Sequence, residues 1–458
     1  MQPAVILNYI KPLLTMKPVI SYLLLGMLLA PPLLHAQQKP PTMDQTTQEN
    51  LHALLRAEYY EIQQHYYDPR YHGVDLAALY KTLDARIDRA ETLNQGYILL
   101  EAFSQALHDS HTTFILPHRT YRSDSGFEYA MIGDKCFVTH VRPKTDAVGK
   151  IYPGDQILAY NGYKVERESF EQMRDFFGVT TAQATALYLE APDGRVRHEL
   201  VQHRIVKSYV TRDYTADNAN MNSLNDLREE EDEDKFSKPK VADLGDVVVW
   251  KQPDFERTDT EMGTVMAHLV MGHKALVLDL RGNPGGDVNT LKFMVGELMD
   301  HDVTIATLEA RKPEKPLIAK TVKGHVYPGK VFVLVDSESA SAAELLAKEV
   351  QLEHRGKVLG DRTAGAVMES KRYLETIGGD TVIPAYFSIT FANLIMSDGK
   401  SLEGIGVEPD EKLLPTPSDL GSGADPVLAQ AINEAGGSIT PEAAGKLFPF
   451  KWRPIDTE

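Results

Sequence analysis

The run LDLRGNPGGD, residues 278–287, decides the fold class. It continues an apolar stretch that begins at Ala275, and a helical pattern follows it over residues 288–299. An unbroken apolar run of strand length followed by a helix is typical of a strand buried on both faces of a parallel sheet. The run therefore predicts a strand–turn–helix junction in an α/β core.

The same alternation of strand and helix continues on both sides of this junction. Strand patterns occupy residues 247–250, 330–335 and 357–359, and helical patterns occupy residues 258–271 and 342–352. Strands separated by helices predict a mostly parallel sheet covered on both faces. We expect this core to span residues 246–415.

Two regions with other patterns precede the core. Over residues 37–117 the apolar side chains recur at spacings of three and four, which predicts a small helical domain. Residues 118–208 change to short strands, with the type I′ turn signal Asn161-Gly162 and one amphipathic helix over residues 167–177. This second region is predicted to be a compact, partly open barrel.

The N-terminus carries the pattern of a signal peptide over residues 1–36. Lys11 and Lys17 precede an apolar stretch over residues 19–30, and Leu34-His35-Ala36 offers a cleavage site. The apolar stretch is shorter than the roughly 20 residues that span a bilayer. We therefore expect export to the periplasm or beyond, with a retained N-terminal anchor as the alternative.

Two further segments are expected to connect or flank the domains. Residues 209–245 contain the acidic run 229–234, which is typical of a solvated linker. Residues 416–458 form a tail rich in Gly, Pro and Ala, with one expected helix over residues 426–435.

Composition excludes several classes of function. The 458 residues carry a formal net charge of −17, which repels phosphate backbones and argues against general nucleic-acid binding. The single cysteine, Cys136, excludes intramolecular disulfides and four-cysteine zinc sites, and its strand setting indicates a small buried side chain. No HExxH, cysteine cluster or nucleotide-binding motif is present, so we expect neither a metal nor an organic cofactor.

The glycine pair Gly285-Gly286 has two interpretations. Free backbone N–H groups at such a turn can bind an oxyanion, because glycine lets the backbone approach another group closely. A tight turn that requires positive φ would equally call for two glycines. The residues alone do not separate these interpretations.

A second strand–turn–helix junction, VDSESASAAE over residues 335–344, contains Ser341. Ser341 and Glu344 have the spacing of a helix capping box. Alternatively, a serine at this turn exposes its hydroxyl beside the helix N-terminus, where the N–H of Ala342 would stabilise negative charge. One serine can satisfy both interpretations.

A serine nucleophile needs a base to take its proton. The candidate base is His111, which follows Ser110 at the end of the helical region, whereas the place of His108 suggests a helix cap. Glu403 could be a third member, although from the residues alone it is a loop carboxylate.

Four ordered runs resemble the S41 serine peptidases: LDLRGNPGG, VDSESASAAE, GDRTAGA and EGIGVEPD. This family includes C-terminal processing peptidases and the tricorn core protease. The resemblance implies a crotonase-like (ClpP-like) α/β core, an inserted PDZ-like domain and an N-terminal helical domain. The segment YPGDQIL, residues 152–158, is similar to the PDZ segment of the family.

The resemblance also implies roles for individual residues. It makes Ser341 the nucleophile, with Ser337 and Ser339 as spectators. It places the oxyanion donors on Gly285-Gly286 and on the amide of Ala342.

The two branches of the family differ in their general base. The processing branch uses a lysine, but Ala366 occupies its position here, and Lys371 is a distant substitute. The tricorn-like branch uses a Ser-His pair and a glutamate, which Ser110, His111 and Glu403 match. In that arrangement His111 is the base, and Ser110 and Glu403 orient it.

The leading interpretation is thus an exported serine peptidase that acts on polypeptides. The PDZ-like domain would capture an extended polypeptide by strand addition to a sheet edge. A non-catalytic binding protein for a peptide or hydrophobic ligand is the main alternative, since related folds bind ligands without hydrolysis. An acyl-CoA enzyme on the crotonase core is a third interpretation, which the export signal disfavours.

Overall fold

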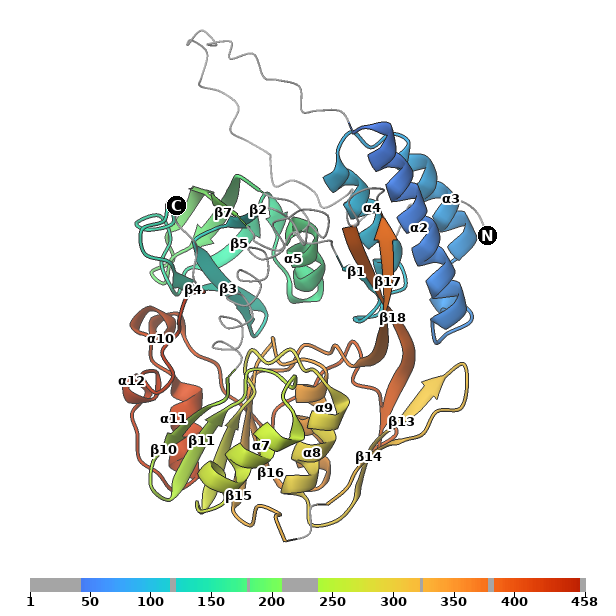
Figure 1. Ribbon diagram of the computed structural model, residues 1–458. Helices are drawn as coiled ribbons and strands as arrows, with labels where there is room; N and C mark the ends of the chain where they lie inside the picture. The colour runs from blue at the N-terminus through green and yellow to red at the C-terminus, as the bar shows by residue number, and fades with distance from the viewer. Residues whose placement is uncertain are drawn as a thin grey trace, which may run out of the picture.

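The computed structural model describes residues 43–115, 121–178, 182–207, 238–321, 324–377 and 383–453. The expected signal peptide and the acidic run 229–234 lie outside these residues. Figure 1 shows a group of helices, a strand-rich region and a larger α/β region, in that order along the chain. Among the described residues, no helix is both long and apolar enough to span a bilayer.

The α/β region contains a six-stranded sheet in the order β10-β11-β12-β15-β16-β19. Its strands are β10 (Lys240–Asp243), β11 (Val247–Lys251), β12 (Ala275–Asp279), β15 (Lys330–Val335), β16 (Gly356–Gly360) and β19 (Glu411–Lys412). Only β10 pairs antiparallel to its neighbour. The expected mostly parallel sheet is confirmed.

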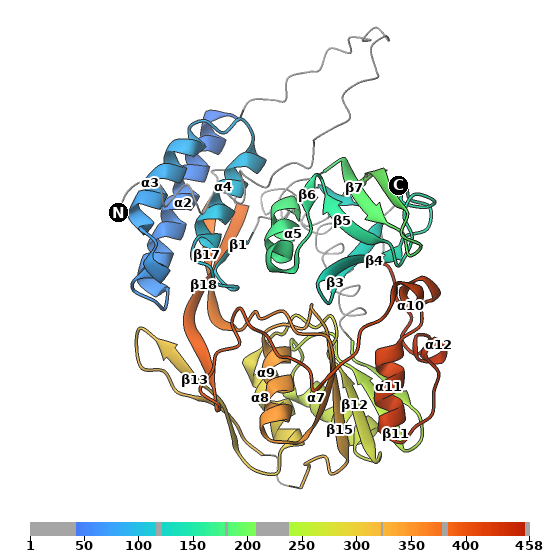
Figure 2. The ribbon, with the colours of Figure 1, turned by 180° about the vertical axis from the view of Figure 1, so that it is seen from behind.

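Helices cover both faces of this sheet. Successive side chains of a buried strand point to opposite faces, so each strand contributes to two separate cores. In β12, Leu276 and Leu278 share a core with α8 (Val288–Leu298) and α9 (Ala342–Leu352). Ala275 and Val277 instead pack with α11 (Pro426–Glu434). Figure 2 shows α11 standing apart from α8 and α9 across the strands.

A second sheet has no counterpart in the sequence-based expectations. Its main element is the hairpin of β17 (Met368–Ile377) and β18 (Ile383–Met396), to which β1, β13 and β14 add. These three strands are β1 (Thr113–Ile115), β13 (Val303–Ala310) and β14 (Leu317–Ala319).

The N-terminal helices pack against this hairpin. They are α2 (Gln45–His65), α3 (Leu76–Ile87) and α4 (Leu93–Gln105), in agreement with the helical pattern. Leu51, Leu55 and Phe103 share one buried cluster with Phe387 and Ile389 of β18. The helices therefore complete a core that distant residues, far later in the chain, help to build.

The strand-rich region has a sheet in the order β3-β4-β5-β7-β8, with β3 at one edge. Its elements are β3 (Phe127–Ile132), β4 (Lys135–Val141), β5 (Gln156–Tyr160), β6 (Tyr163–Lys164), α5 (Phe170–Gly178), β7 (Ala184–Glu190) and β8 (Val196–Gln202), beside the pair β2 (Tyr121–Asp124) and β9 (Arg204–Lys207). The β5–β6 turn has φ of 49° at Asn161 and 83° at Gly162, which confirms the type I′ turn. Cys136 is buried, as expected, and burial raises the pKa of its thiol.

Polar contacts join the strand-rich region to the loops of the α/β region. The Ser337 hydroxyl donates to the carbonyl oxygen of Met131 at 2.6 Å. Arg167 forms a buried ion pair with Asp361 at 2.9 Å. The loop that leads to Ser341 is therefore held against β3.

One expected helix differs in form. The pattern over residues 258–271 gives α7 (Asp259–Val265), which continues as a π-helical turn, η3 (Met266–Val270). Met271 N–H donates to the carbonyl oxygen of Met266, five residues earlier, at 3.0 Å. This wider turn has no signature that periodicity could detect.

Candidate active site

Ser341 lies between β15 and the first residue of α9. Its backbone has φ 54° and ψ −118°, a strained conformation for any residue other than glycine and unlike the extended N-cap of an ordinary helix. Two hydrogen bonds of its N–H group hold it there, to the Ala366 carbonyl at 2.9 Å and to Glu344 Oε2 at 3.0 Å. Such strain at a strand-to-helix turn is typical of functional sites.

Glu344 is buried beneath the same turn. Besides Ser341 N–H, its carboxylate accepts hydrogen bonds from Thr363 Oγ1 and from the N–H groups of Gly365 and Ala366, at 2.5, 2.8 and 2.9 Å. Burial raises its pKa to about 7, although these four donors oppose the change. The glutamate half of the expected capping box is present, but Glu344 also fixes the loop beside Ser341, a role that the spacing alone did not reveal.

Both glycines of the pair are required by close contacts. Their φ angles are 94° and 143°. A Cβ on Gly285 would come within 2.7 Å of Ser341 Cβ and 2.9 Å of Ala342 N, and one on Gly286 would meet the backbone of Phe255 at 2.7 Å. The glycine loop and the turn at Ser341 are therefore in direct contact.

The amides of this loop do not all face the same way. Gly285 N–H donates to Asn283 Oδ1 at 2.8 Å. Among the described residues, neither Gly286 N–H nor Ala342 N–H has a hydrogen-bond acceptor. Gly286 and Ala342 are thus the available pair of donors, whereas the amide of Gly285 is already engaged.

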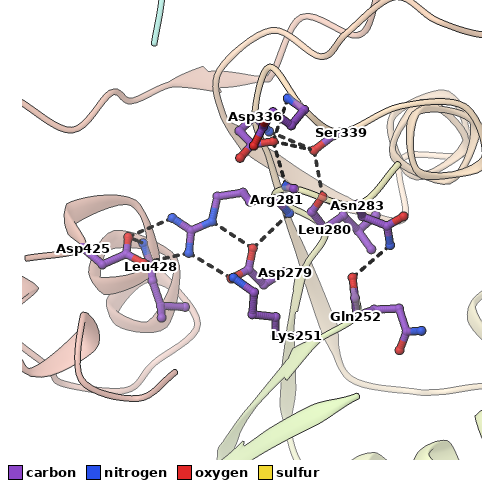
Figure 3. Close-up of polar contacts among 12 residues, drawn as sticks. Lys251, Gln252, Asp279, Leu280, Arg281, Asn283, Asp336, Ser339, Asp425 and Leu428 are labelled. Carbon is purple, nitrogen blue, oxygen red and sulfur yellow. Dashed lines mark hydrogen bonds and ion pairs between the residues drawn. The ribbon is translucent and has the colours of Figure 1, made fainter. Parts of the chain in front are cut away.

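A network behind the glycine loop fixes its position (Figure 3). Arg281 makes two hydrogen bonds to Asp279 and two to Asp425, at 2.7 to 2.9 Å. Burial alone would raise the pKa of Asp279, but Arg281 and Lys251 hold it at about 2. Asp425 caps α11, so this helix anchors the loop.

Two further contacts join this loop to the Ser341 turn. Asp336 Oδ1 accepts from Gly282 N–H at 2.9 Å, and Ser339 Oγ donates to the Leu280 carbonyl at 2.8 Å. Asn283 is fully buried, and its Nδ2 donates to the Gln252 carbonyl at 2.9 Å. The two strand–turn–helix junctions of the sequence therefore form one rigid unit.

The structure brings Ser110, His111 and Glu403 together. Ser110 Oγ lies 2.7 Å from His111 Nδ1 and donates to Glu403 Oε2 at 2.8 Å. A hydroxyl has one hydrogen, so Ser110 must accept from a protonated Nδ1 while it donates to Glu403. The lone pair of a neutral His111 ring is then on Nε2.

The surroundings of His111 favour its neutral form. Burial lowers the pKa of the ring, and the nearby Asp109 opposes this change. Asp109 Oδ1 accepts from His111 N–H at 3.0 Å and from Thr390 Oγ1 at 2.5 Å, so it also fixes the turn. A neutral imidazole can accept a proton near neutral pH.

Residues 366 and 367 connect Ser341 to the His111 group. The carbonyl of Ala366 accepts from Ser341 N–H, and the next N–H group, of Val367, donates to Glu403 Oε2 at 2.8 Å. In the described structure no hydrogen bond joins the Ser341 hydroxyl to His111. Catalytic hydrogen bonds of this kind often tighten only when a substrate binds.

The other residues named from the sequence lie outside this group. Lys371 is exposed on β17, with its Nζ 4.4 Å from the centre of the Phe391 ring. Ser337 and Ser339 use their hydroxyls to bond backbone carbonyls. His108 is exposed and has φ 56° just after α4.

Comparison with known proteins finds a family model that matches the α/β region. Residues 246–413, which include the glycine loop, Ser341 and Glu403, match the model of peptidase family S41. This part of the chain is therefore similar to peptidase family S41.

Two bacterial proteases are similar to part of the chain. The carboxy-terminal processing protease CtpA of Bacillus subtilis is 25% identical over 283 residues, 61% of this chain and 53% of the relative. A CtpA-like serine protease of Staphylococcus haemolyticus is 27% identical over 161 residues, 34% of this chain and 31% of the relative. The chain thus spans about half or less of these relatives.

A solved structure shows the same fold over a larger share of the chain. Mature CPAF has a TM-score of 0.59 and 15% sequence identity, and the match covers 86% of this chain and 99% of CPAF. The chain therefore shares the mixed α/β fold of this solved structure. Among its described residues, no group of three or more His, Cys, Asp and Glu is arranged to hold a metal ion.

Proposed function

We propose that this chain is a serine peptidase that hydrolyses peptide bonds in polypeptides, with Ser341 as the nucleophile and His111 as the general base. One observation carries the proposal. Ser110 bonds both His111 and Glu403, while the strained Ser341 turn is tied to Glu403 through Ala366 and Val367.

The proposed reaction uses the two free amides and the oriented ring. Nε2 of His111 takes the proton of the Ser341 hydroxyl as its Oγ attacks the peptide carbonyl carbon. The N–H groups of Gly286 and Ala342 stabilise the resulting oxyanion. The imidazolium then gives its proton to the leaving amine, and water hydrolyses the acyl-enzyme by the same steps.

Ser110 and Glu403 orient the base in this proposal. Glu403 fixes the direction of the Ser110 hydroxyl, which keeps the proton of a neutral His111 on Nδ1. When His111 becomes positively charged, the nearby carboxylate stabilises the charge through Ser110. Burial raises the pKa of Glu403, and hydrogen bonds from Val367 and Ser110 oppose this change.

The finer assignment of the domains belongs to the same proposal. We assign a helical domain to residues 37–117, a PDZ-like domain to 118–208 and a linker to 209–245. A crotonase-like core follows over residues 246–415, and a tail over 416–458. Since β3 is an edge strand, an extended polypeptide could add to it. The signal peptide at residues 1–36 implies an exported enzyme, either periplasmic or secreted.

A fluorophosphonate probe tests the proposal, because it labels only an activated serine. We expect labelling of the mature chain that is lost in Ser341→Ala and retained in Ser337→Ala, the matched control on the same loop. If the wild-type chain is not labelled and cleaves no polypeptide, a non-catalytic binding protein becomes the better assignment.

A further inference from the structure

A cavity of about 370 Å³ lies between α7, η3 and α8, and none of its lining residues belongs to the site described above. Its volume is at the lower end of the range for small-ligand pockets. Apolar and acidic side chains share its lining, which includes Asp259, Ala267, Met271, Phe293, Glu297 and His325.

Glu297 is the unusual member of this lining. Glu297 is only 4% exposed. No described residue forms a hydrogen bond or ion pair with its carboxylate. Glu344, which is more deeply buried, has four donors. Burial raises the pKa of Glu297, and the nearby His325 opposes this change. A cation that enters the cavity would stabilise the ionised carboxylate further.

The backbone on the opposite wall is also unusual. Ala267 lies within the π-helical turn η3, and Met271 closes its hydrogen bond. Such turns are rare and occur frequently at functional sites. This observation is independent of Glu297, and both point to the same cavity.

We propose that this cavity binds a primary alkylammonium group, as carried by a free alkylamine or a lysine side chain. The ammonium group donates to Glu297, and the methylene chain lies against Met271 and Phe293. Asp259 at the cavity adds a second negative charge. The proposal does not depend on the proposed peptidase activity, because it uses none of the same residues.

The test is calorimetric titration of the full chain with pentylamine, with pentan-1-ol as the neutral probe of the same length. We expect the amine to bind more tightly than the alcohol. Loss of a charged hydrogen bond in Glu297→Gln should weaken amine binding about ten- to a hundredfold. Asp300→Asn removes the same charge from an exposed position just beyond α8 and should leave binding unchanged.

A second variant keeps the test valid if Glu297→Gln does not fold. Ala267→Phe starts from an exposed residue, and its ring would fill the cavity and weaken binding without changing the charge. Titration with acetyl-Gly-Lys-Gly-amide distinguishes the two possible ligands, because binding of this peptide shows that the cavity accepts the ammonium group of a lysine side chain as well as that of a free amine. Equal affinities for amine and alcohol, no amine binding, or unaltered binding in both variants would overturn the proposal.

Discussion

Ser110 and Glu403, 293 residues apart, are joined by two hydrogen bonds: Glu403 Oε1 accepts from the Ser110 N–H at 2.7 Å, and Oε2 accepts from the Ser110 hydroxyl at 2.8 Å. The pair therefore fixes both the backbone and the side chain of the residue that holds His111. In the proposed mechanism His111 is the base, and a base needs a partner that sets its tautomer, which this pair provides.

Ser341→Ala should reduce kcat for peptide hydrolysis by about 10³- to 10⁶-fold, because it removes the nucleophile. The fold should persist, since the backbone bonds from Ser341 N–H to Ala366 and Glu344 do not need the hydroxyl. Loss of a cap costs about 1 kcal/mol. Hydrolysis of a peptide substrate and urea unfolding measure the two effects, and full activity in the variant would contradict the assignment.

His111→Ala should lower kcat about as severely as Ser341→Ala, because Ala366 leaves no lysine at the usual position of the base. Lys371→Ala should stay within a few-fold of the wild type, since Lys371 is exposed beside Phe391. The double variant of His111 and Ser341 should be little worse than either single one. An inactive lysine variant beside an active histidine variant would instead indicate a Ser–Lys dyad.

The pH dependence of kcat/KM should report the neutral form of His111. Burial lowers its pKa below 6.5, so activity should rise with pH through an apparent pKa below that value. Glu403→Gln removes the charge that stabilises the imidazolium, which should move this midpoint further down and lower kcat. A profile that is flat across this region, or an unchanged midpoint in Glu403→Gln, would argue against the relay.

Glu349, in the middle of α9, should make the fold less stable as pH rises. Both of its carboxylate oxygens are buried without a hydrogen-bond partner in the described structure, and burial raises its pKa from 4.5 to about 8. The folded state then binds more protons than the unfolded state between these values, so the free energy of unfolding decreases with pH across that window.

Glu349→Gln should remove this decline and raise the free energy of unfolding near pH 8 by more than about 1 kcal/mol. Urea unfolding of both proteins near pH 5 and near pH 8 measures the difference. Glu314→Gln, an exposed glutamate outside α9, is the control. Parallel pH profiles for Glu349→Gln and the wild type would show that Glu349 is not the cause.

Much of the fold could be predicted because its signals are local. Apolar runs followed by helical periodicity predicted β12 and α8, and β15 and α9, almost to the residue. The hairpin β17–β18 was missed, since its arms carry mixed side chains that become buried where the N-terminal helices and the α/β core cover them. Strand propensity depends strongly on such tertiary neighbours.

The sequence by itself determined where Ser341, His111, Ser110 and Glu403 lie along the chain, through the order and spacing of the motifs. Only the tertiary structure decided which of their atoms meet. It directed the amide of Gly285 to Asn283 and left Gly286 and Ala342 as the free pair, and it placed Glu344 beneath the loop. Spacing fixes local backbone geometry, whereas a hydrogen bond between distant residues depends on how separate elements pack.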